Sequence, residues 1–350
     1  MSEAPRICGE CETTSPNRRE FLATAAATSV ALPLLWATPK PAVAAPTMRS
    51  PAETAVSALY QSLTEEQKRV ICFAWDYRSP NRGLLRTHVS NNWQITQPHI
   101  RSNFFTREQQ TIIHDIFRGI INPEWYNRFV QQLRDDTGGQ PWGAEQSIAI
   151  FGTPGEGNFE FVMTGRHMTL RADGNSTEHV GFGGPIFYGH AAEGFNEKAD
   201  HPNNVFWPQA LLANGVFAIL DEAQQRRALL PRSPAEAAVG FRGPNGQIPG
   251  LPVSEMTHDQ KAEMQRVLAG LLEPFRVEDQ AEALECLRQQ GGLDACYLSF
   301  YADSDIGNDG VWDNWRLEGP SFVWYFRGRP HVHVWVNVAS NPNVPLNARG

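Results

Sequence analysis

The chain has 350 residues, of which 41% are hydrophobic and 10% aromatic, and its formal net charge at pH 7 is −8. This composition is typical of a globular protein with enough apolar side chains for a sizeable core. The negative charge and the lack of any long Lys/Arg run exclude nucleic acid as the main partner, because affinity for phosphate depends on clustered basic groups.

Residues 1–44 are expected to be an export signal and not part of the fold. The paired arginines Arg18 and Arg19 open "RREFL", an apolar run follows over 23–36, and "AVA" at 42–44 has the small-x-small pattern of a cleavage site. This order resembles a twin-arginine signal, which implies the translocation machinery as a partner and a periplasmic or extracellular location. An ordinary secretory signal or a disordered tail remains the alternative. At about fourteen residues the apolar run is too short for a stable membrane span, which needs about twenty.

The cysteines allow one disulfide after export. Cys8 and Cys11 would be removed with the signal. Cys286 and Cys296 are close enough in the sequence to pair in an oxidising compartment, although they can equally stay reduced. Cys72 would then be the odd thiol.

Four segments have the pattern of a helix start. A capping residue is followed three positions later by Gln and then by apolar residues at helical spacing, and the four caps are Thr64, Thr106, Asp221 and Thr257. Further helices are predicted over 123–135, where Pro123 suits a first turn, and over 277–290. Local helix-start chemistry explains the four similar segments more simply than a duplicated unit does.

Strand-like runs lie between and after these helices. They cover 147–152, 158–165, 166–173, 296–303, 314–320, 321–328 and 331–339. The short "RGRP" connection predicts a hairpin between the last two. The predicted class is α+β: an antiparallel sheet, with a mixed sheet as the alternative, and helices packed on one face. Residues 45–350 are expected to form one domain, with an irregular surface loop over 233–252.

The last strand separates its valines from its histidines. Side chains of a strand alternate between faces, so Val332, Val334, Val336 and Val338 share one face, and His331, His333, Trp335 and Asn337 share the other. The same alternation in 166–173 places His167 opposite Met168 and Leu170. If both strands belong to one sheet, the three histidines face the same way.

Three imidazoles so placed can converge on one metal ion, because residues two apart on a strand lie about 6.5–7 Å apart on one face. His167, His331 and His333 are therefore the candidate ligands of a mononuclear zinc, copper or iron site. His190, Glu318 and, in reserve, Glu160 are further candidates. The alternative is a polar strand face without metal, since His-x-His alone is a weak pattern. Arg166, Arg316 and Trp335 are the candidates for binding a substrate, the arginines through an anionic group.

Five short motifs occur in a characteristic order: "VMTGRHMTL", "FGGPIFYGH", "LDEAQQRRAL", "WRLEGPSFVWYF" and "PHVHVW". In this order the chain resembles the domain of unknown function 3500 family, from about Leu59 to Asn337. The resemblance implies a fold unit but no reaction. The family's first motif commonly reads Gly-His-His, where this chain has Arg166 before His167. Its last motif often continues with Arg-Asp, where this chain has Val336 and Asn337. Charge-dependent chemistry of the family can therefore be altered here.

The sequence thus predicts an exported protein that binds one metal ion through strand-borne histidines and is a candidate metal-dependent enzyme, with its reaction and catalytic residues left open. No Ser or Cys nucleophile motif and no nucleotide-binding motif is present. The alternative is a non-catalytic periplasmic binding module that holds a small molecule, sugar or peptide on an aromatic sheet face formed by Trp315, Trp324 and Trp335.

Overall fold

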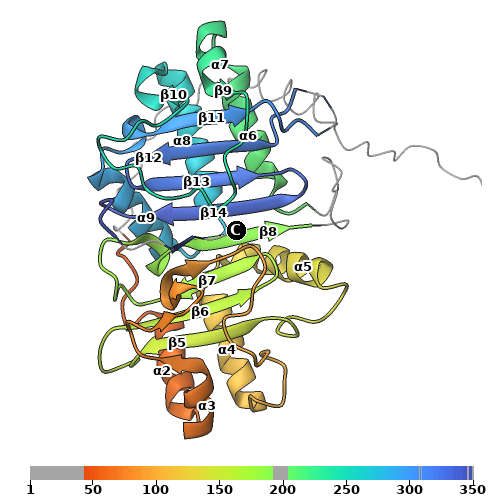
Figure 1. Ribbon diagram of the computed structural model, residues 1–350, viewed down its shortest axis with the longest axis vertical. Helices are drawn as coiled ribbons and strands as arrows, with labels where there is room; N and C mark the ends of the chain where they lie inside the picture. Colours follow the sequence, from red (N-terminus) through yellow and green to blue (C-terminus); the bar gives the residue numbers. More distant parts are fainter. Residues whose placement is uncertain (1–42, 192–203, 307, 309, 345–346, 349–350) are drawn as a thin grey trace, which may run out of the picture.

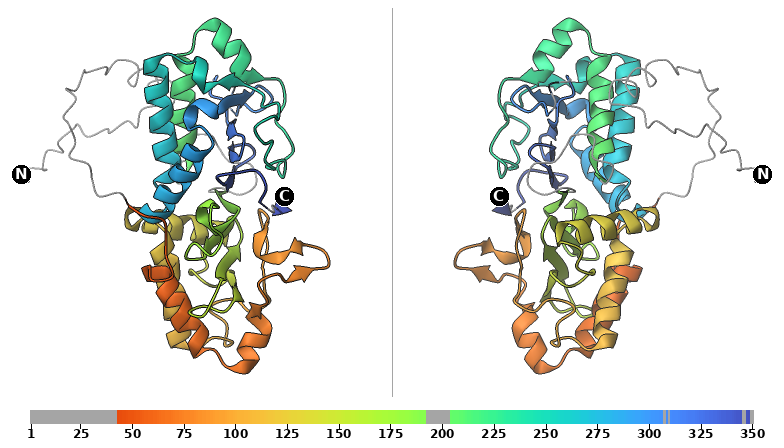
Figure 2. Two further views of the ribbon diagram at one scale, coloured as in Figure 1. Left: turned by 90° about the vertical axis from the view of Figure 1, so that its left-hand side faces the viewer. Right: turned by 90° about the vertical axis from the view of Figure 1, so that its right-hand side faces the viewer.

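The computed structural model describes residues 43–191, 204–306, 308, 310–344 and 347–348. Within these ranges the chain forms a large mixed sheet of 11 strands with helices packed on one face (Figure 1). Seen along the sheet, the helices form a second layer on one side and long loops lie on the other (Figure 2). The predicted α+β class is confirmed, in its mixed form.

The sheet has the order β1-β5-β6-β7-β8-β14-β13-β12-β11-β10, and β9 also pairs with β11. The strands of the N-terminal half are β1 (Cys72–Phe73), β5 (Ser147–Gly152), β6 (Phe159–Gly165), β7 (Met168–Ala172) and β8 (Ile186–His190). Those of the C-terminal half are β9 (Leu229–Leu230), β10 (Leu251–Pro252), β11 (Tyr297–Tyr301), β12 (Asn314–Gly319), β13 (Phe322–Arg327) and β14 (Val332–Val338). β1 and β9 run parallel to their neighbours and the remaining pairs are antiparallel. Two small ladders join β2 (Arg78–Ser79) to β3 (Gly83–Leu84) and β4 (His88–Val89) to β15 (Asn347–Ala348).

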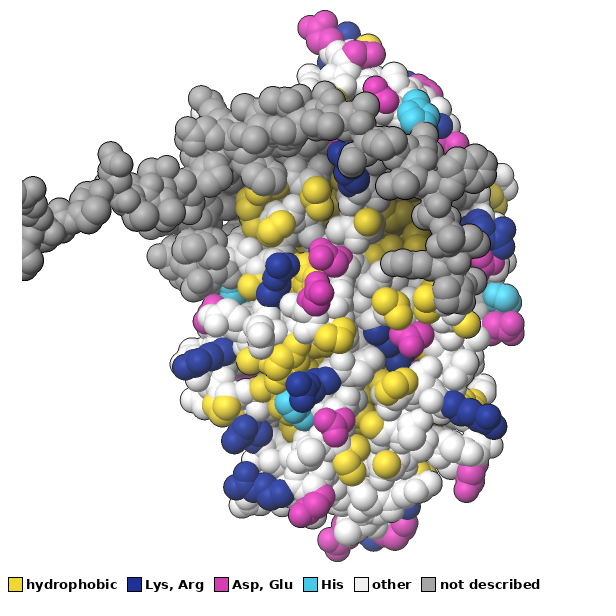
Figure 3. Space-filling model, turned by 180° about the vertical axis from the view of Figure 1, so that it is seen from behind, with side chains coloured by type: hydrophobic (Ala, Val, Ile, Leu, Met, Phe, Trp, Pro, Cys, Tyr) yellow, Lys and Arg dark blue, Asp and Glu magenta, His cyan; other side chains and the backbone are white. Residues whose placement is uncertain are grey.

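The helices of the N-terminal half are α2 (Pro51–Ser62), α3 (Glu65–Ile71), α4 (Arg107–Ile120) and α5 (Tyr126–Asp136), and those of the C-terminal half are α6 (Trp207–Ala218), α7 (Glu222–Ala228), α8 (His258–Leu272) and α9 (Val277–Gln289). All four predicted capping boxes are present, with reciprocal side-chain and backbone hydrogen bonds. The helices α2 and α6 and the strand β8 were not predicted. On the described part of the helix-covered side, basic and acidic side chains are interspersed (Figure 3).

The two halves repeat the same succession of elements. Each begins with a long helix, a short capped helix and a short parallel strand, and later adds two longer helices and four antiparallel strands. The side chains of the capping glutamines also pair within each half: Gln67 with Gln109, and Gln224 with Gln260. The halves meet at the antiparallel pair β8–β14 in the middle of the sheet. The structure therefore favours a duplicated unit over the simpler interpretation from local helix-start chemistry.

Other predictions about chain ends and thiols have separate outcomes. The expected export signal lies outside the described residues, apart from Val43 and Ala44. No helix in the described ranges is both long and apolar enough to cross a membrane. Cys286 and Cys296 are both free and buried, so they do not form the disulfide that the sequence allows. Cys72 is half-buried and also free.

Candidate metal centre

His167 lies in the tight turn between β6 and β7. Gly165 pairs with Met168, so Arg166 and His167 form a two-residue connection, and β7 begins one residue after His167. His167 has a left-handed φ of 55°, which is uncommon for a residue other than glycine. Its N–H donates to the Asn91 carbonyl at 3.0 Å, and its carbonyl accepts from the Gly189 N–H at 3.1 Å. The turn is therefore fixed from both sides.

His167 and His333 lie on either side of Gly189 in β8, which bonds to the His167 carbonyl and pairs with His333. β8 lies between β7 and β14, and Gly189 of β8 pairs with His333 of β14. Because Gly189 has no side chain, nothing fills the space between the imidazoles on either side of it. A Cβ at this position would lie 2.3 Å from the Val332 carbonyl oxygen. Glycine is therefore required for β8 and β14 to approach as they do.

The predicted division of β14 into two faces is confirmed. Val332, Val334, Val336 and Val338 belong to the core beneath the helices. Trp335, on the histidine face, packs instead with Val89, Phe187 and Val239. Since Val89 of β4 and Val239 of the loop after β9 pack against it, this face is covered and is not open to solvent. His167, His331 and His333 are only 3%, 5% and 8% exposed.

The three histidines converge on one another. The Nε2 atom of His167 lies 3.2 Å from Nε2 of His331 and 3.0 Å from Nε2 of His333. One ligand atom from each of the three lies within 4.8 Å of the others. Ligand atoms about 2.1 Å from a tetrahedral ion are roughly 3.4 Å apart, which is close to these separations. Over the described part of the chain, the His, Cys, Asp and Glu side chains that lie close enough together to hold one metal ion are these three histidines.

Carboxylates contact the opposite ring nitrogens. His167 Nδ1 lies 2.9 Å from Asp136 Oδ2, and His333 Nδ1 is hydrogen-bonded to Glu236 Oε1. An ionised carboxylate only accepts hydrogen bonds, so a neutral ring that meets it through a protonated Nδ1 would turn a lone pair on Nε2 toward the opposite ring. Two such lone pairs 3.0 Å apart repel each other unless a cation lies between them. Carboxylate–histidine pairs of this kind support metal ligands in proteins.

Both carboxylates are held in place by further donors. Asp136, at the end of α5, accepts from the Ala191 N–H at 2.9 Å and from the Gln132 amide at 3.0 Å. Glu236, in the loop after β9, lies 3.0 Å from Arg327 Nη1 and accepts from the Trp335 indole at 3.3 Å. These contacts fix the two carboxylates and, through them, the orientation of the rings.

Burial and close contacts together set the charge states of His333, Asp136 and Glu236. Loss of hydration lowers the pKa of His333 to about 4, although the hydrogen bond to Glu236 acts in the opposite direction. Burial alone would raise the pKa values of Asp136 and Glu236, but their contacts with His167 and His333 hold both below the ordinary range. At neutral pH, His333 is therefore a neutral potential ligand and both carboxylates are ionised.

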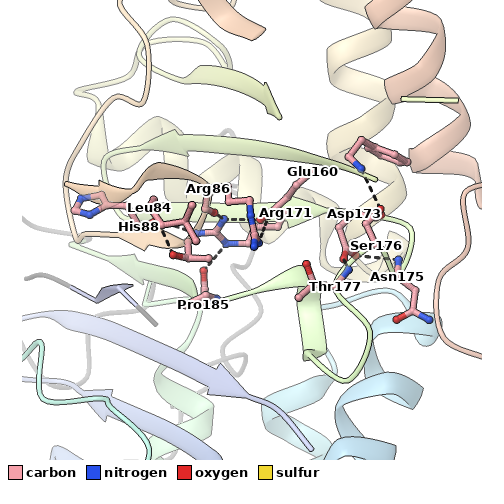
Figure 4. Close-up of polar contacts among 12 residues, drawn as sticks. Leu84, Arg86, His88, Glu160, Arg171, Asp173, Asn175, Ser176, Thr177 and Pro185 are labelled. Carbon is pink, nitrogen blue, oxygen red and sulfur yellow. Dashed lines mark hydrogen bonds and ion pairs between the residues drawn. The ribbon is translucent and has the colours of Figure 1, made fainter. Parts of the chain in front are cut away.

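The further candidate ligands do not join the cluster. His190 pairs with Val332, which places it on the opposite face, and its Nδ1 lies 3.9 Å from Asp136 Oδ1. Glu318 binds Arg242 at 2.7 Å and Arg316 at 3.1 Å. Glu160 is fully buried against Arg171, at 2.6 Å, with Arg86 at 3.5 Å (Figure 4). Each acid thus neutralises arginines away from the histidines.

The candidate substrate-binding residues differ in availability. Arg316 is buried, pairs with Glu318 and donates to the Ala238 carbonyl at 2.7 Å, so it holds the loop after β9 in place. Trp335 lies under the same loop. Arg166, next to His167, has no ion pair in the described residues, and its Nε is buried without a hydrogen bond. Of the two candidate arginines, Arg166 is therefore the one without a carboxylate partner among the described residues.

The proposed aromatic binding face does not exist as one surface. Trp315 and Trp324 pack in the core beneath the helices, on the face opposite Trp335. The alternation along β12 and β13, applied strand by strand, would have separated them. The sugar- or peptide-binding alternative therefore loses two of its three tryptophans.

The second half of the chain provides an internal comparison. The turn between β12 and β13 also has two residues, Pro320 and Ser321, and the Ala339 N–H donates to the Ser321 carbonyl at 2.9 Å. Ser321 and Ala339 thus occupy the places of His167 and Gly189. Ser321 stands where the first half has His167, so only the turn of the first half contributes an imidazole to the cluster. A comparison of the two tight turns in the sequence would have drawn attention to His167 and Gly189, whereas Asp136 and Glu236 carry no local signal.

Comparison with known proteins adds a family but no activity. No curated protein and no solved structure matches the chain significantly. One family model, described as a protein of unknown function, covers residues 47–338 and so includes every residue of the histidine cluster. As its motifs suggested, the chain belongs to the domain of unknown function 3500 family.

Proposed function

We propose that this chain is an exported protein that binds one transition-metal ion through the Nε2 atoms of His167, His331 and His333. The observation that carries the proposal is the convergence of three Nε2 atoms, together with the carboxylates that contact the far side of two of the rings, His167 and His333. One Nε2 can serve only one N–H···N hydrogen bond, so His167 cannot satisfy both neighbours in that way. A shared cation can.

The donor set indicates the kind of metal and the kind of chemistry. Three neutral imidazoles suit zinc, copper or iron, and an ion with three protein ligands keeps a position for water or substrate, as catalytic sites do. Zinc would supply hydrolytic chemistry, whereas copper or iron would supply redox chemistry. The protein's own part is to fix the three rings, keep His333 neutral and exclude bulk water.

Arg166 is the group we assign to substrate binding at this site. It directly precedes His167 in the same two-residue turn, and no described residue neutralises its charge. A guanidinium there would hold a carboxylate or phosphate group. Replacing Arg166 with Gln should leave the metal content unchanged but weaken acetate and phosphate binding to the cobalt-substituted protein, followed by its visible spectrum. Equal affinities in both proteins would remove Arg166 from the site.

Elemental analysis tests the proposal. Protein purified from an exporting host should carry about one equivalent of metal, and His167→Ala, His331→Ala or His333→Ala should each remove most of it. His258→Ala is the matched control, because that side chain is fully exposed on α8. Metal well below one equivalent, unchanged by the three substitutions, would contradict the proposal and favour a non-catalytic binding module.

A further inference from the structure

A second group of titratable side chains lies between α2, α9 and the loop after β7. Glu53 forms two hydrogen bonds with Arg276, at 2.7 and 2.8 Å, and Asp279 lies 3.0 Å from Arg276 Nε. Asp173 and Glu282 complete the group. All five residues are at most 6% exposed. Two of these four buried carboxylates, Glu53 and Asp279, contact the one guanidinium of the group, and buried charge of one sign calls for a further cation or for protonation.

Glu282 is the member of this group with one carboxyl oxygen that no described residue satisfies. Its Oε2 accepts from the Phe182 N–H at 3.1 Å, but its Oε1 is buried and has no hydrogen bond to any described residue. Asp173, by contrast, accepts from the N–H groups of Asn175 at 3.1 Å and Thr177 at 2.8 Å (Figure 4). Because buried carboxylate oxygens are nearly always hydrogen-bonded, Glu282 Oε1 marks the place for a missing donor.

The space beside Glu282 adjoins the predicted cleavage point. A cavity of about 480 Å³ is lined by Glu282, Glu178 and His179 and, on its other side, by Val43, Ala44 and Ala45. The chain that follows touches the fold at two points: Pro46 is buried, and the Met48 backbone lies so close to Gly174 that a Cβ on Gly174 would be 3.0 Å from the Met48 nitrogen. The first docked residues are therefore those that would begin the processed protein.

We infer that the α-ammonium of Ala45, released by cleavage after Ala44, binds Glu282 in this cavity. The inference rests on the export part of the proposed function and is independent of the metal. A signal peptidase hydrolyses the Ala44–Ala45 bond with one water: Ala44 retains the new carboxyl group and leaves, and Ala45 gains an amino group, which takes up a proton at neutral pH. In the uncleaved chain that nitrogen is an amide without charge.

The electrostatics of the uncleaved chain support this inference. Burial, together with the negative charges of Asp173 and Asp279, raises the pKa of Glu282 to about 9. An ammonium in contact with Glu282 would favour its ionised form and offset the excess negative charge of the group. Processing would thus convert a neutral, partly unsatisfied carboxyl into an ion pair.

Four proteins test the inference: the full chain and the processed protein, each with Glu282 and with E282Q. Mass spectrometry should show that the processed protein begins at Ala45. Processing should increase the folding equilibrium constant at least tenfold with Glu282 and less than twofold with E282Q. E285Q is the matched control, because Glu285 lines the same cavity but already binds Arg288. An equal effect of processing in both backgrounds, or a processed chain that begins elsewhere, would overturn the inference.

A second measurement does not depend on the stability of E282Q. The α-amine of the processed protein, labelled by reductive ¹³C-methylation, should titrate above the ordinary value of about 8 for an N-terminus. A pKa at or below that value would overturn the inference. Neither result would be confused with failure of the metal proposal, which metal content decides separately.

Discussion

Gly189 is the residue whose replacement should damage the histidine cluster most selectively without touching a histidine. In Gly189→Ala the new Cβ would lie 2.3 Å from the Val332 carbonyl oxygen, where ordinary contacts begin near 3.4 Å. To restore an ordinary contact between this Cβ and the carbonyl oxygen, β8 and β14 must separate by about 1 Å. Overpacking of this kind costs about 1–3 kcal/mol of unfolding free energy.

The same shift should weaken metal binding. His333 pairs with Gly189, and its Nε2 lies 3.0 Å from that of His167, so a movement of about 1 Å exceeds the roughly 0.5 Å within which a site must be held. We expect at least a tenfold lower affinity, measured by competition with a chromophoric chelator, and a lower urea midpoint for the metal-free protein.

Gly157→Ala is the control, since a Cβ there meets nothing within 4 Å. If Gly189→Ala kept both the wild-type affinity and the wild-type midpoint, the row formed by His167, Gly189 and His333 could not be what positions the ligands.

Three further predictions concern the groups around the site and the core. Glu236→Gln removes the charge behind His333 and should lower metal affinity about tenfold in chelator competition; an unchanged affinity would separate Glu236 from the site. Arg276→Met leaves Glu53 and Asp279 buried without a cation and should cost about 3–5 kcal/mol in urea unfolding, so a loss below about 1 kcal/mol would contradict the ion-pair assignment. In the full chain, folding raises the pKa of Glu282 from an ordinary 4.5 to about 9. Between these two pH values, the folded state holds the proton and the unfolded state does not. Stability should therefore fall as the pH rises through that interval, by up to about 1.4 kcal/mol per pH unit for Glu282. Glu282→Gln should remove this contribution most visibly above pH 7, where Asp173 and Asp279, whose pKa values are raised to about 7, are already ionised.

Local patterns were sufficient to predict much of the fold. The four Thr or Asp caps with Gln three residues later predicted real helix starts, because capping depends on neighbouring atoms only. The valine stripe of β14 predicted its buried face for the same reason: the alternation belongs to the strand itself. The helix α6 was missed because it is apolar on most sides and so lacks the periodicity that marks a surface helix.

The candidate site was predictable only in part. The alternation expected along two strands grouped His167, His331 and His333 on one face, but His167 lies in the turn before β7, and the strand β8 that brings the histidines together was not predicted. Asp136 ends a helix and Glu236 lies in an irregular loop, and both reach the histidines through tertiary packing that leaves no trace in the nearby sequence. The assignment of Trp315 and Trp324 to a binding face failed because the faces of separate strands were not compared.

Anomalous X-ray diffraction from crystals of the purified protein, recorded at the absorption edge of the metal found by elemental analysis, tests the central claim most directly. The account predicts one strong anomalous peak about 2.1 Å from each Nε2 of His167, His331 and His333. A fully ordered cluster with no peak there, or a metal bound through other side chains, would contradict it.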